Sequence, residues 1–229
     1  MESIPWKLQQ VRHRIAQSCA SAHRDVQSVT LLAVSKTFGA DVVREAHAAG
    51  QSAFGENYVQ EALAKITALA TLEPRVAWHL IGPLQSNKTR EVAAAFDWVH
   101  SIDRLKIAER LSAQRPAHLE PLQLCLQVNV SGEASKSGVA PHDLPALARA
   151  VSALPRVRLR GLMAIPEPVD DFDAQRMPHR RLRELLETLR ADGLALDTLS
   201  TGMSADLEAA IAEGATMVRV GSALFGARA

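Results

Sequence analysis

The feature of this chain that most constrains its fold is a repeated alternation between short apolar runs and helical stretches. The runs are rich in β-branched and aliphatic residues, which is typical of buried strands, and they lie near 29–35, 52–55, 76–81, 97–100, 122–130, 157–164, 196–199 and 216–220. Stretches rich in Ala, Leu, Glu and Arg follow them near 41–49, 57–70, 87–95, 103–114, 142–153, 171–192 and 204–213, and another precedes them near 6–21. Strands that alternate with helices predict a parallel sheet built from βα units.

The length of the chain favours one way of closing these units. Eight βα units in 229 residues fit a single (β/α)8 TIM-type barrel with an extra N-terminal helix, so the fold class is α/β. No stretch rich in Pro, Gly or Ser interrupts the alternation, and we therefore expect residues 1–229 to form one domain. An open, doubly wound sheet is the alternative that the same alternation allows.

The composition argues against nucleic acid as a partner. The formal net charge is +1 and aromatic residues make up only 4% of the chain, so neither electrostatic capture nor base stacking is indicated. Apolar residues make up 47% and charged residues 22%, which suits a globular protein with a large core. The arginine-rich stretch near 171–192 is therefore expected to be a solvated outer helix with its leucines turned inward.

Signals for targeting, metal binding and redox chemistry are weak. The N-terminal residues contain no apolar signal core, and no run of about 18 apolar residues follows, so we expect a cytoplasmic protein with no membrane partner. Cys19 and Cys125 lack the spacing of a zinc site or a disulfide framework, and no metal is expected. Because a barrel has no open strand edge, we expect a monomer.

Lys36 ends the first predicted strand, Thr30-Leu31-Leu32-Ala33-Val34-Ser35-Lys36. An ammonium group is costly to bury without a partner, and a buried lysine commonly escapes through a lowered pKa that makes its amine a nucleophile toward carbonyl compounds. Lys36 is therefore a candidate Schiff-base lysine. The alternative is a lysine that caps the strand end and keeps its ammonium group in water.

The C-terminal part of the chain carries a second signal. Ser200-Thr201-Gly202-Met203-Ser204 leads from a strand into a helix, and Gly221-Ser222 ends the last strand. Gly202 allows backbone N–H groups to approach a ligand, and Ser204 is a candidate N-cap. Loops after strands 7 and 8 form the phosphate site common in such barrels. The alternative is that Gly202 and Gly221 only serve tight turns.

Arg219 is the third part of the pattern. Strand alternation places Met217, Arg219 and Gly221 on one face of the last strand. An arginine inside the mouth of a barrel needs a partner, and either a phosphate or a heteroaromatic nitrogen would serve.

A Schiff-base lysine, a phosphate site and an arginine near a ring together fit pyridoxal 5′-phosphate (PLP), which has an aldehyde, a phosphate and a pyridine nitrogen. Arginine stays protonated, so it would donate to the pyridine nitrogen and keep that nitrogen unprotonated. An unprotonated ring is a poorer electron sink, which favours holding the cofactor over broad carbanion chemistry.

Motifs along nearly the whole chain resemble those of the pyridoxal phosphate homeostasis proteins, single-domain PLP-binding proteins with the barrel of fold-type III PLP enzymes. The matching segments are Ala33-Val34-Ser35-Lys36, Phe54-Gly55-Glu56-Asn57-Tyr58-Val59-Gln60-Glu61, Trp78-His79-Leu80-Ile81-Gly82-Pro83-Leu84-Gln85-Ser86-Asn87-Lys88, Ser135-Lys136-Ser137-Gly138, Gly161-Leu162-Met163 and 199–228. Each segment alone is weak evidence for the family, but their occurrence in order along the chain makes the combination specific.

The resemblance implies a role for each matching residue. Lys36 would be the internal aldimine lysine, and Arg219 would face the pyridine nitrogen. Ser200 and Thr201, with the backbone around Gly202, Gly221 and Ser222, would hold the phosphate, while Asn57, His79 and Met163 would line the pocket. The chain departs from the family at Thr201, where methionine is expected in many relatives, and at Thr37-Phe38-Gly39, where a lysine-proline continuation is more usual.

The resemblance also implies a function without established catalysis: a carrier or buffer that keeps PLP bound and passes it on, with apo PLP-dependent enzymes as recipients.

A fold-type III enzyme such as an amino-acid racemase shares these features, but it needs a second acid/base, which alanine racemases take from a tyrosine of a second domain. Tyr58 is the single tyrosine here, and His79 is the other candidate. An aldolase-type barrel would instead need a carboxylate near Lys36, for which Glu56 is the strand-end candidate. Lys88 and Lys136 are expected at the open face, and this placement motivates the hypothesis of a second PLP contact or transfer station there.

Overall fold

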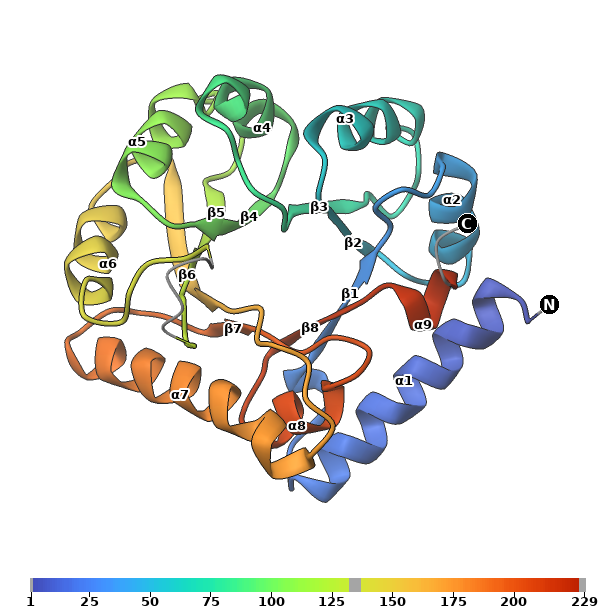
Figure 1. Cartoon of the computed structure of the whole chain (residues 1–229). Coiled ribbons are helices and arrows are strands. Elements are labelled where there is room, and N and C mark those ends of the chain that lie inside the picture. Colours follow the sequence, from blue (N-terminus) through green and yellow to red (C-terminus); the bar gives the residue numbers. More distant parts are fainter. Residues whose placement is uncertain (1, 132–136, 227–229) are drawn as a thin grey trace.

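The computed structural model describes residues 2–131 and 137–226, and these form a closed barrel of parallel strands surrounded by helices (Figure 1). Neighbouring strands pair in chain order, and the barrel closes where the last strand pairs with the first, from Thr30 opposite Met217 to Ala33 opposite Val220. The strands are β1 (Thr30–Val34), β2 (Ala53–Glu56), β3 (Ala77–Leu80), β4 (Trp98–Ile102), β5 (Leu122–Gln127), β6 (Val157–Met163), β7 (Thr198–Ser200) and β8 (Met217–Val220). The predicted (β/α)8 barrel is confirmed.

Helices alternate with the strands and cover the outside of the barrel (Figure 1). They are α1 (Ile4–Ser21), α2 (Ala40–Ala48), α3 (Val59–Ala68), α4 (Thr89–Ala95), α5 (Leu105–Gln114), α6 (Leu144–Ser152), α7 (Phe172–Ala191), α8 (Leu207–Ala212) and α9 (Ser222–Phe225), with 3₁₀ turns η1 (Val26–Ser28) and η2 (Ser86–Lys88). All eight predicted helices are present. The sequence did not predict α9, because a single turn is too short to show a hydrophobic period.

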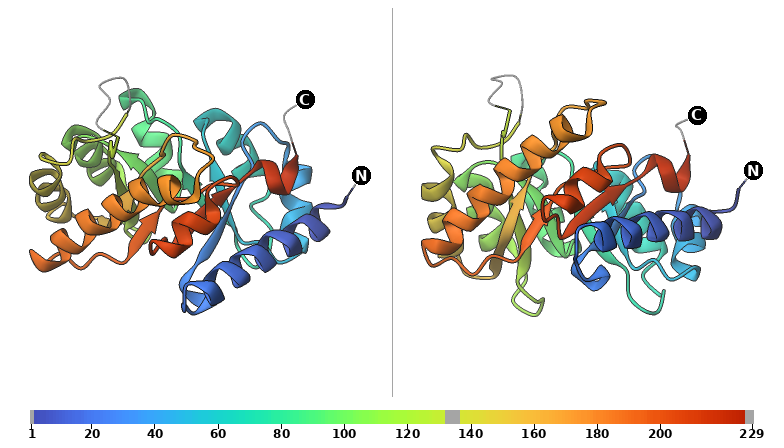
Figure 2. Two further views of the ribbon diagram at one scale, coloured as in Figure 1. Left: turned by 60° about the horizontal axis from the view of Figure 1, so that its bottom comes forward. Right: turned by 90° about the horizontal axis from the view of Figure 1, so that it is seen from below.

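The extra helix α1 packs on the outside of the barrel, against other outer helices (Figure 1). It begins after Ser3, whose Oγ accepts a hydrogen bond from the N–H group of Trp6 at 3.4 Å. Its apolar side chains recur at helical spacing and are buried against α2, α8 and α9: Leu8, Val11, Ile15 and Cys19. Figure 2 shows α1 lying along α8 and α9. Burying each aliphatic side chain contributes roughly 1.5–3 kcal/mol, so this helix is an integral part of the domain.

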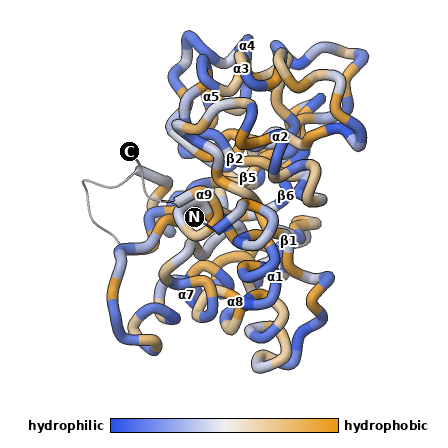
Figure 3. Tube along the Cα trace, turned by 90° about the vertical axis from the view of Figure 1, so that its right-hand side faces the viewer, coloured by the Kyte–Doolittle hydropathy of each residue, from blue (hydrophilic) through white to orange (hydrophobic). Residues whose placement is uncertain are grey.

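The strands bury both of their faces, as expected for parallel sheets. Side chains that point outward, such as Phe54 and Leu80, join the large core between the sheet and the helices. Side chains that point inward form a small apolar cluster, which includes Leu32, Ile81 and Met217. Figure 3 shows hydrophobic and hydrophilic residues alternating along the outer helices, which is the pattern of helices that bury one face against the sheet.

Within residues 2–131 and 137–226, no helix combines the length and apolar character needed to cross a membrane. Among the same residues, no cluster of three or more His, Cys, Asp or Glu side chains could hold a metal ion.

The arginine-rich helix α7 is an outer helix, as the sequence predicted. Its leucines 182, 186 and 189 are buried, whereas three of its arginines converge on one carboxylate. Arg176 Nε lies 2.8 Å, Arg180 Nη2 2.9 Å and Arg183 Nη1 3.2 Å from the carboxylate oxygens of Glu213, which is only 1% exposed. Several of the arginines of α7 are therefore structural ion-pair partners of the α8–β8 turn.

Replacing Glu213 by glutamine is expected to lower the free energy of unfolding at pH 7 by about 1–2 kcal/mol, because three arginines lose their common anion. Burial alone would raise the pKa of Glu213, but the hydrogen bonds from Arg180 and Arg176 hold it below the usual 4.5. A lowered folded-state pKa stabilises the protein above pH 4.5 and loses that effect as the pH falls through the folded-state value. Urea denaturation should therefore show the two proteins converging at acidic pH, and a difference that persists there would contradict this account.

Candidate functional site

A cavity of about 390 Å³ opens at the carboxyl ends of the barrel strands. Such a volume lies in the range of small-molecule sites. The cavity is lined by Val34, Lys36, Thr37, Phe38, Asn57, Ile81, Ile165, Met203, Ser204, Ala205, Arg219, Gly221, Ser222 and Gly226. The structure therefore brings five of the predicted site residues together: Lys36, Asn57, Arg219, Gly221 and Ser222.

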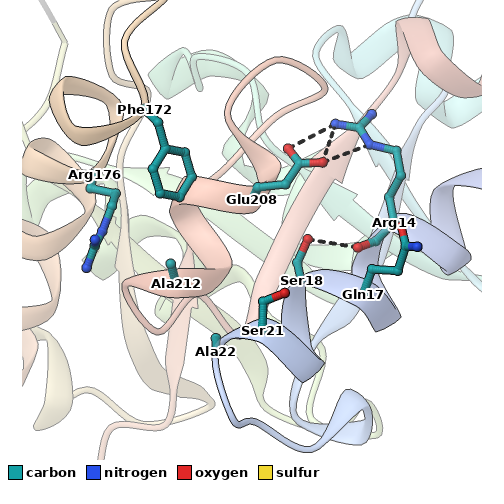
Figure 4. Close-up of a pocket in the computed structure, with 9 residues that line it drawn as sticks. All are labelled: Arg14, Gln17, Ser18, Ser21, Ala22, Phe172, Arg176, Glu208 and Ala212. Atoms are coloured by element: carbon teal, nitrogen blue, oxygen red, sulfur yellow. Dashed lines mark hydrogen bonds and ion pairs between the residues drawn. The ribbon is translucent and has the colours of Figure 1, made fainter.

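A second hollow, of about 510 Å³, lies outside the barrel between α1, α7 and α8 (Figure 4). Its charged side chains are paired with one another or with their surroundings. Arg14 holds Glu208 through Nε at 3.0 Å and Nη2 at 2.9 Å, and Arg176 holds Glu213. None of its lining residues belongs to a strand, so the candidate site is the cavity at the strand ends.

Lys36 enters the cavity because of strand alternation. It lies two residues beyond the end of β1, its side chain is half-buried, and it follows Val34, which also lines the cavity. Ser35, between them, points outward and is fully buried. The alternation therefore sends the amine of Lys36 toward the cavity, while Ser35 is fixed in the layer behind it.

Two loops, one after β7 and one after β8, present backbone N–H groups, and the second packs against the end of β1 where Gly221 meets Val34. The N–H groups of Ser204 and Ser222 have no hydrogen-bond acceptor among the described residues, and Ser222 Oγ donates to Ser204 Oγ at 3.3 Å. Gly202 has a φ of +94°, and a Cβ atom there would lie 2.5 Å from Ala210 Cβ, so only glycine lets this loop turn against α8. Free N–H donors on two adjacent loops suit an anion.

The prediction that Ser204 caps α8 is wrong. The helix begins at Leu207, and Asp206 occupies the N-cap position. Asp206 Oδ1 accepts a hydrogen bond from the N–H group of Met203 at 2.6 Å, which closes the loop one turn before the helix. Ser204 is thereby released from the helix end and lines the cavity.

Arg219 lies at the floor of the cavity and is held by neighbouring strands. It is 4% exposed, and its Nη1 group donates to both the carbonyl oxygen and the Oγ atom of Ser200, while Nη2 donates to the carbonyl oxygen of Ala164 at 2.8 Å. Its Nε–H group and one Nη2–H have no acceptor among the described residues. Burial lowers the pKa of Arg219 to about 10, so the guanidinium remains charged at neutral pH with donors available to a ligand.

A chain of buried polar groups continues below Arg219. Ser200 Oγ lies 2.8 Å from His100 Nδ1, and His100 Nε2 lies 3.0 Å from His79 Nδ1. Burial lowers the pKa of His79 to about 3 and that of His100 well below its usual value, so both rings are neutral. Because Arg219 only donates, the arrangement that satisfies every group has Ser200 donating to His100 and His100 donating to His79. These hydrogen bonds therefore orient the hydroxyl group of Ser200 toward Arg219 without adding a charge.

The structure places the other five predicted site residues outside the cavity lining: His79, Met163, Ser200, Thr201 and Gly202. The sequence predicted that His79 and Met163 line the pocket. Ile81 and Ile165, two positions further along the chain, line the cavity instead. Sequence reasoning missed Ile81, Ile165 and the loop 203–205, although extending the strand alternation by two residues would have found the two isoleucines.

Thr201 has a structural contact where the resemblance suggested a phosphate contact or a turn cap. Its Oγ1 atom lies 2.8 Å from His179 Nδ1, and it is 1% exposed. His179 Nε2 in turn lies 3.2 Å from Asp206 Oδ2. The hydroxyl group therefore joins β7 to α7 and to the loop before α8.

The sequence predicted two lysines at the open face, Lys88 and Lys136. Lys88 pairs with Glu91, with 3.1 Å between Nζ and Oε1, and does not line the cavity. Lys136 lies outside the described residues, as do Ser135 and residues 227–228 of the matching motifs.

Comparison with known proteins now places the chain. Residues 7–229 match the family model described as the alanine racemase N-terminal domain. The pyridoxal phosphate homeostasis protein of Pseudomonas aeruginosa is 64% identical over 228 residues, which cover 100% of this chain and 97% of that protein. The structure of PipY from Synechococcus elongatus with PLP bound has a TM-score of 0.80 and 42% identity, and the match covers 93% of this chain and 100% of that one.

A solved structure of an unknown protein from Bifidobacterium adolescentis is also similar, with a TM-score of 0.90 and 36% identity over 97% of this chain and 94% of that one. These matches extend over nearly the whole length of each partner and include the segments on which the sequence resemblance was based. The chain therefore belongs to the pyridoxal phosphate homeostasis protein family, within the family of the alanine racemase N-terminal domain.

Proposed function

We propose that this protein binds PLP in the cavity at the strand ends and serves as a carrier or buffer in PLP homeostasis. The observation that carries the proposal is the placement of a lysine amine, a buried arginine and two loops with free N–H groups around one cavity. The names of the relatives support it, and so does the PLP bound to the similar structure of PipY.

The residues present fit the cofactor at each of its ends. When bound, PLP supplies an aldehyde whose carbon forms a C=N bond with a lysine amine while its oxygen leaves as water. Lys36 Nζ would hold the aldehyde end, the N–H groups of Ser204 and Ser222 would hold the phosphate, and the free donors of Arg219 would meet the ring nitrogen.

One buried atom of the cavity wall also requires a partner. Asn57 Oδ1 is buried and has no hydrogen-bond partner in the structure, and Asn57 lines the cavity. The backbone of Asn57 is packed against Gly82, where a Cβ atom would lie 2.3 Å from the carbonyl oxygen of Asn57. Because an unpaired buried oxygen is costly, a ligand that donates a hydrogen bond here is favoured, and the ring hydroxyl of PLP is such a donor.

Holding the cofactor is favoured over racemisation or aldol chemistry. Among the described residues that line the cavity, Lys36 is the only Lys, His, Cys, Tyr, Asp or Glu, so a second acid/base of these types is absent from the lining. The ring of His79 is buried below Arg219, and Tyr58 is 52% exposed and does not line the cavity. Glu56 points into the layer behind the sheet, where it pairs with Lys65, so the carboxylate that an aldolase would need is turned away.

We further propose that the protein acts as a monomer in the cytoplasm and that apo PLP-dependent enzymes receive the cofactor. The closed barrel supports a monomer because no strand edge is left to pair. The cavity opens on one end of the barrel, and a recipient would have to take the cofactor from that end.

The proposal is tested by equilibrating the protein with PLP, removing free ligand by gel filtration, and measuring the PLP that remains. We expect one PLP per chain. When the loaded protein is mixed with an apo PLP-dependent enzyme in the presence of a scavenger of free PLP, we expect the enzyme to recover its activity. A protein that retains no PLP would contradict the binding, and a protein that retains PLP but never supplies the apo-enzyme would contradict the carrier role.

A further inference from the structure

Helix α3 lies against the β1–α2 turn and contributes two charged side chains to it. Glu61 and Lys65 are one helical turn apart, so they lie on the same side of α3. Lys65 is 6% exposed, which is rare for a lysine, whereas Glu61 lies at the surface. Both reach the segment that contains Lys36.

Each of these side chains binds a backbone group next to Lys36. Lys65 Nζ donates to the carbonyl oxygen of Ser35 at 2.7 Å. Glu61 Oε2 accepts from the N–H group of Thr37 at 3.1 Å. The residues immediately before and after Lys36 are therefore both tied to the same face of α3.

The lysine of this pair is itself anchored by a buried carboxylate. Lys65 Nζ lies 2.7 Å from Glu56 Oε1, and Ser35 Oγ donates to the same oxygen at 2.6 Å. Glu56 is fully buried, and burial raises its pKa although Lys65 and Ser35 oppose the shift. The triad of Ser35, Glu56 and Lys65 joins β1, β2 and α3 directly behind the cavity wall.

The turn after Lys36 needs such support. Thr37 has a φ of +70°, in the left-handed region that β-branched residues rarely adopt. A residue held there persists only where its surroundings over-determine the backbone. The hydrogen bond from the N–H group of Thr37 to Glu61 is one such constraint, and the Ser35 anchor is the other.

We propose that Glu61 and Lys65 of α3 are positioning residues that set the direction of the Lys36 side chain before a ligand arrives. This inference rests on the proposed function, because it concerns the amine that would attach to the aldehyde. Among the described residues, Glu61 and Lys65 form no hydrogen bond or ion pair with the loops that carry Ser204 and Ser222, so α3 governs the attachment and not the docking of the phosphate end.

The test compares two ligands that differ only at the reacting group, PLP and 4′-deoxypyridoxine 5′-phosphate, which has a methyl group in place of the aldehyde. In Glu61→Ala the dissociation constant for PLP should rise about two- to tenfold, the effect of one lost hydrogen bond, while that for the deoxy compound stays unchanged. Glu61→Gln is the matched control, because its amide oxygen still accepts from Thr37, and it should bind both ligands as the unmodified protein does.

A second variant checks the backbone part of the argument. Glycine adopts a positive φ without strain, so Thr37→Gly in the Glu61→Ala background should restore PLP affinity. The buried pair is tested separately with Glu56→Gln combined with Lys65→Met, which leaves no buried charge uncompensated. This double variant should also lose PLP affinity selectively.

The outcomes separate the inference from the proposed function. Equal weakening of both ligands in Glu61→Ala, or no weakening of PLP, would overturn the positioning role of α3. An unmodified protein that binds neither PLP nor the deoxy compound would instead overturn the proposed function.

Discussion

Replacing Lys36 by alanine is expected to abolish covalent attachment of PLP while leaving the barrel folded. Lys36 is the lysine that lines the cavity among the described residues, so no other amine there can replace it. Its side chain is half-buried beyond the end of β1, and truncating it should change the free energy of unfolding by no more than about 1 kcal/mol. The measurement is the visible absorption of the protein after incubation with PLP and removal of free ligand.

The matched control is Lys88→Ala. Lys88 is also partly exposed and follows a strand on the same end of the barrel, but it pairs with Glu91 and does not line the cavity. This variant should keep the absorption band of the unmodified protein. A band that survives in Lys36→Ala, or one that disappears equally in both variants, would contradict the assignment of Lys36.

Replacing Arg219 by methionine is expected to lower the free energy of unfolding by about 2–5 kcal/mol. The guanidinium is 4% exposed and donates to the carbonyl oxygens of Ser200 and Ala164 and to the hydroxyl group of Ser200. Methionine fills similar volume but leaves these buried acceptors unpaired. Urea denaturation followed by circular dichroism would measure the loss, and PLP retention should fall as well because the ring loses its donor.

Arg12→Met provides the control for this variant. Arg12 also donates to two backbone carbonyl oxygens, those of Ala49 at 3.4 Å and Gly50 at 2.7 Å, but it does so at the surface, where water can replace it. Its loss should cost less than about 1 kcal/mol and leave PLP retention unchanged. Equal losses of stability in the two variants would show that the buried hydrogen bonds of Arg219 contribute no more to the free energy of unfolding than the surface hydrogen bonds of Arg12.

The order of strands and helices was predictable because each element carries its own hydrophobic period. The eight strands appeared within about three residues of their expected ends, since β-branched runs bounded by turn residues are local signals. Closure of the barrel followed from the number of units. Lys36 was placed by its position at the end of the first strand, and Arg219 by strand alternation. Their roles toward a ligand stay predictions that the experiments above address.

The depth of each residue in the barrel was harder to predict. A strand sequence tells which side chains point inward but not at which layer the cavity begins, so His79 was expected at the wall although it lies beneath Arg219. Ser200 likewise supports Arg219 through its hydroxyl and carbonyl oxygens. Layer depth depends on how neighbouring strands are staggered, which the individual strand sequences do not encode.

Contacts between distant segments were also hidden from the sequence. Glu61 and Lys65 look like an ordinary surface pair at i, i+4, and Glu56 looked like a strand-end acid facing the site. Only the packing of α3 against β1 and β2 shows that Glu56 pairs with Lys65 behind the cavity wall. Thr201 was ambiguous for the same reason, because its partner His179 lies 22 positions away.

The central claim, that Lys36 holds the cofactor, is tested most directly by borohydride reduction of the PLP-loaded protein followed by peptide mapping. Reduction fixes the linkage between the amine and the aldehyde carbon as a stable secondary amine. The account predicts a single pyridoxyl label, carried by Lys36, on the peptide that contains Ala33-Val34-Ser35-Lys36. A label on another lysine, or a protein that takes up no PLP and gives no label, would contradict it.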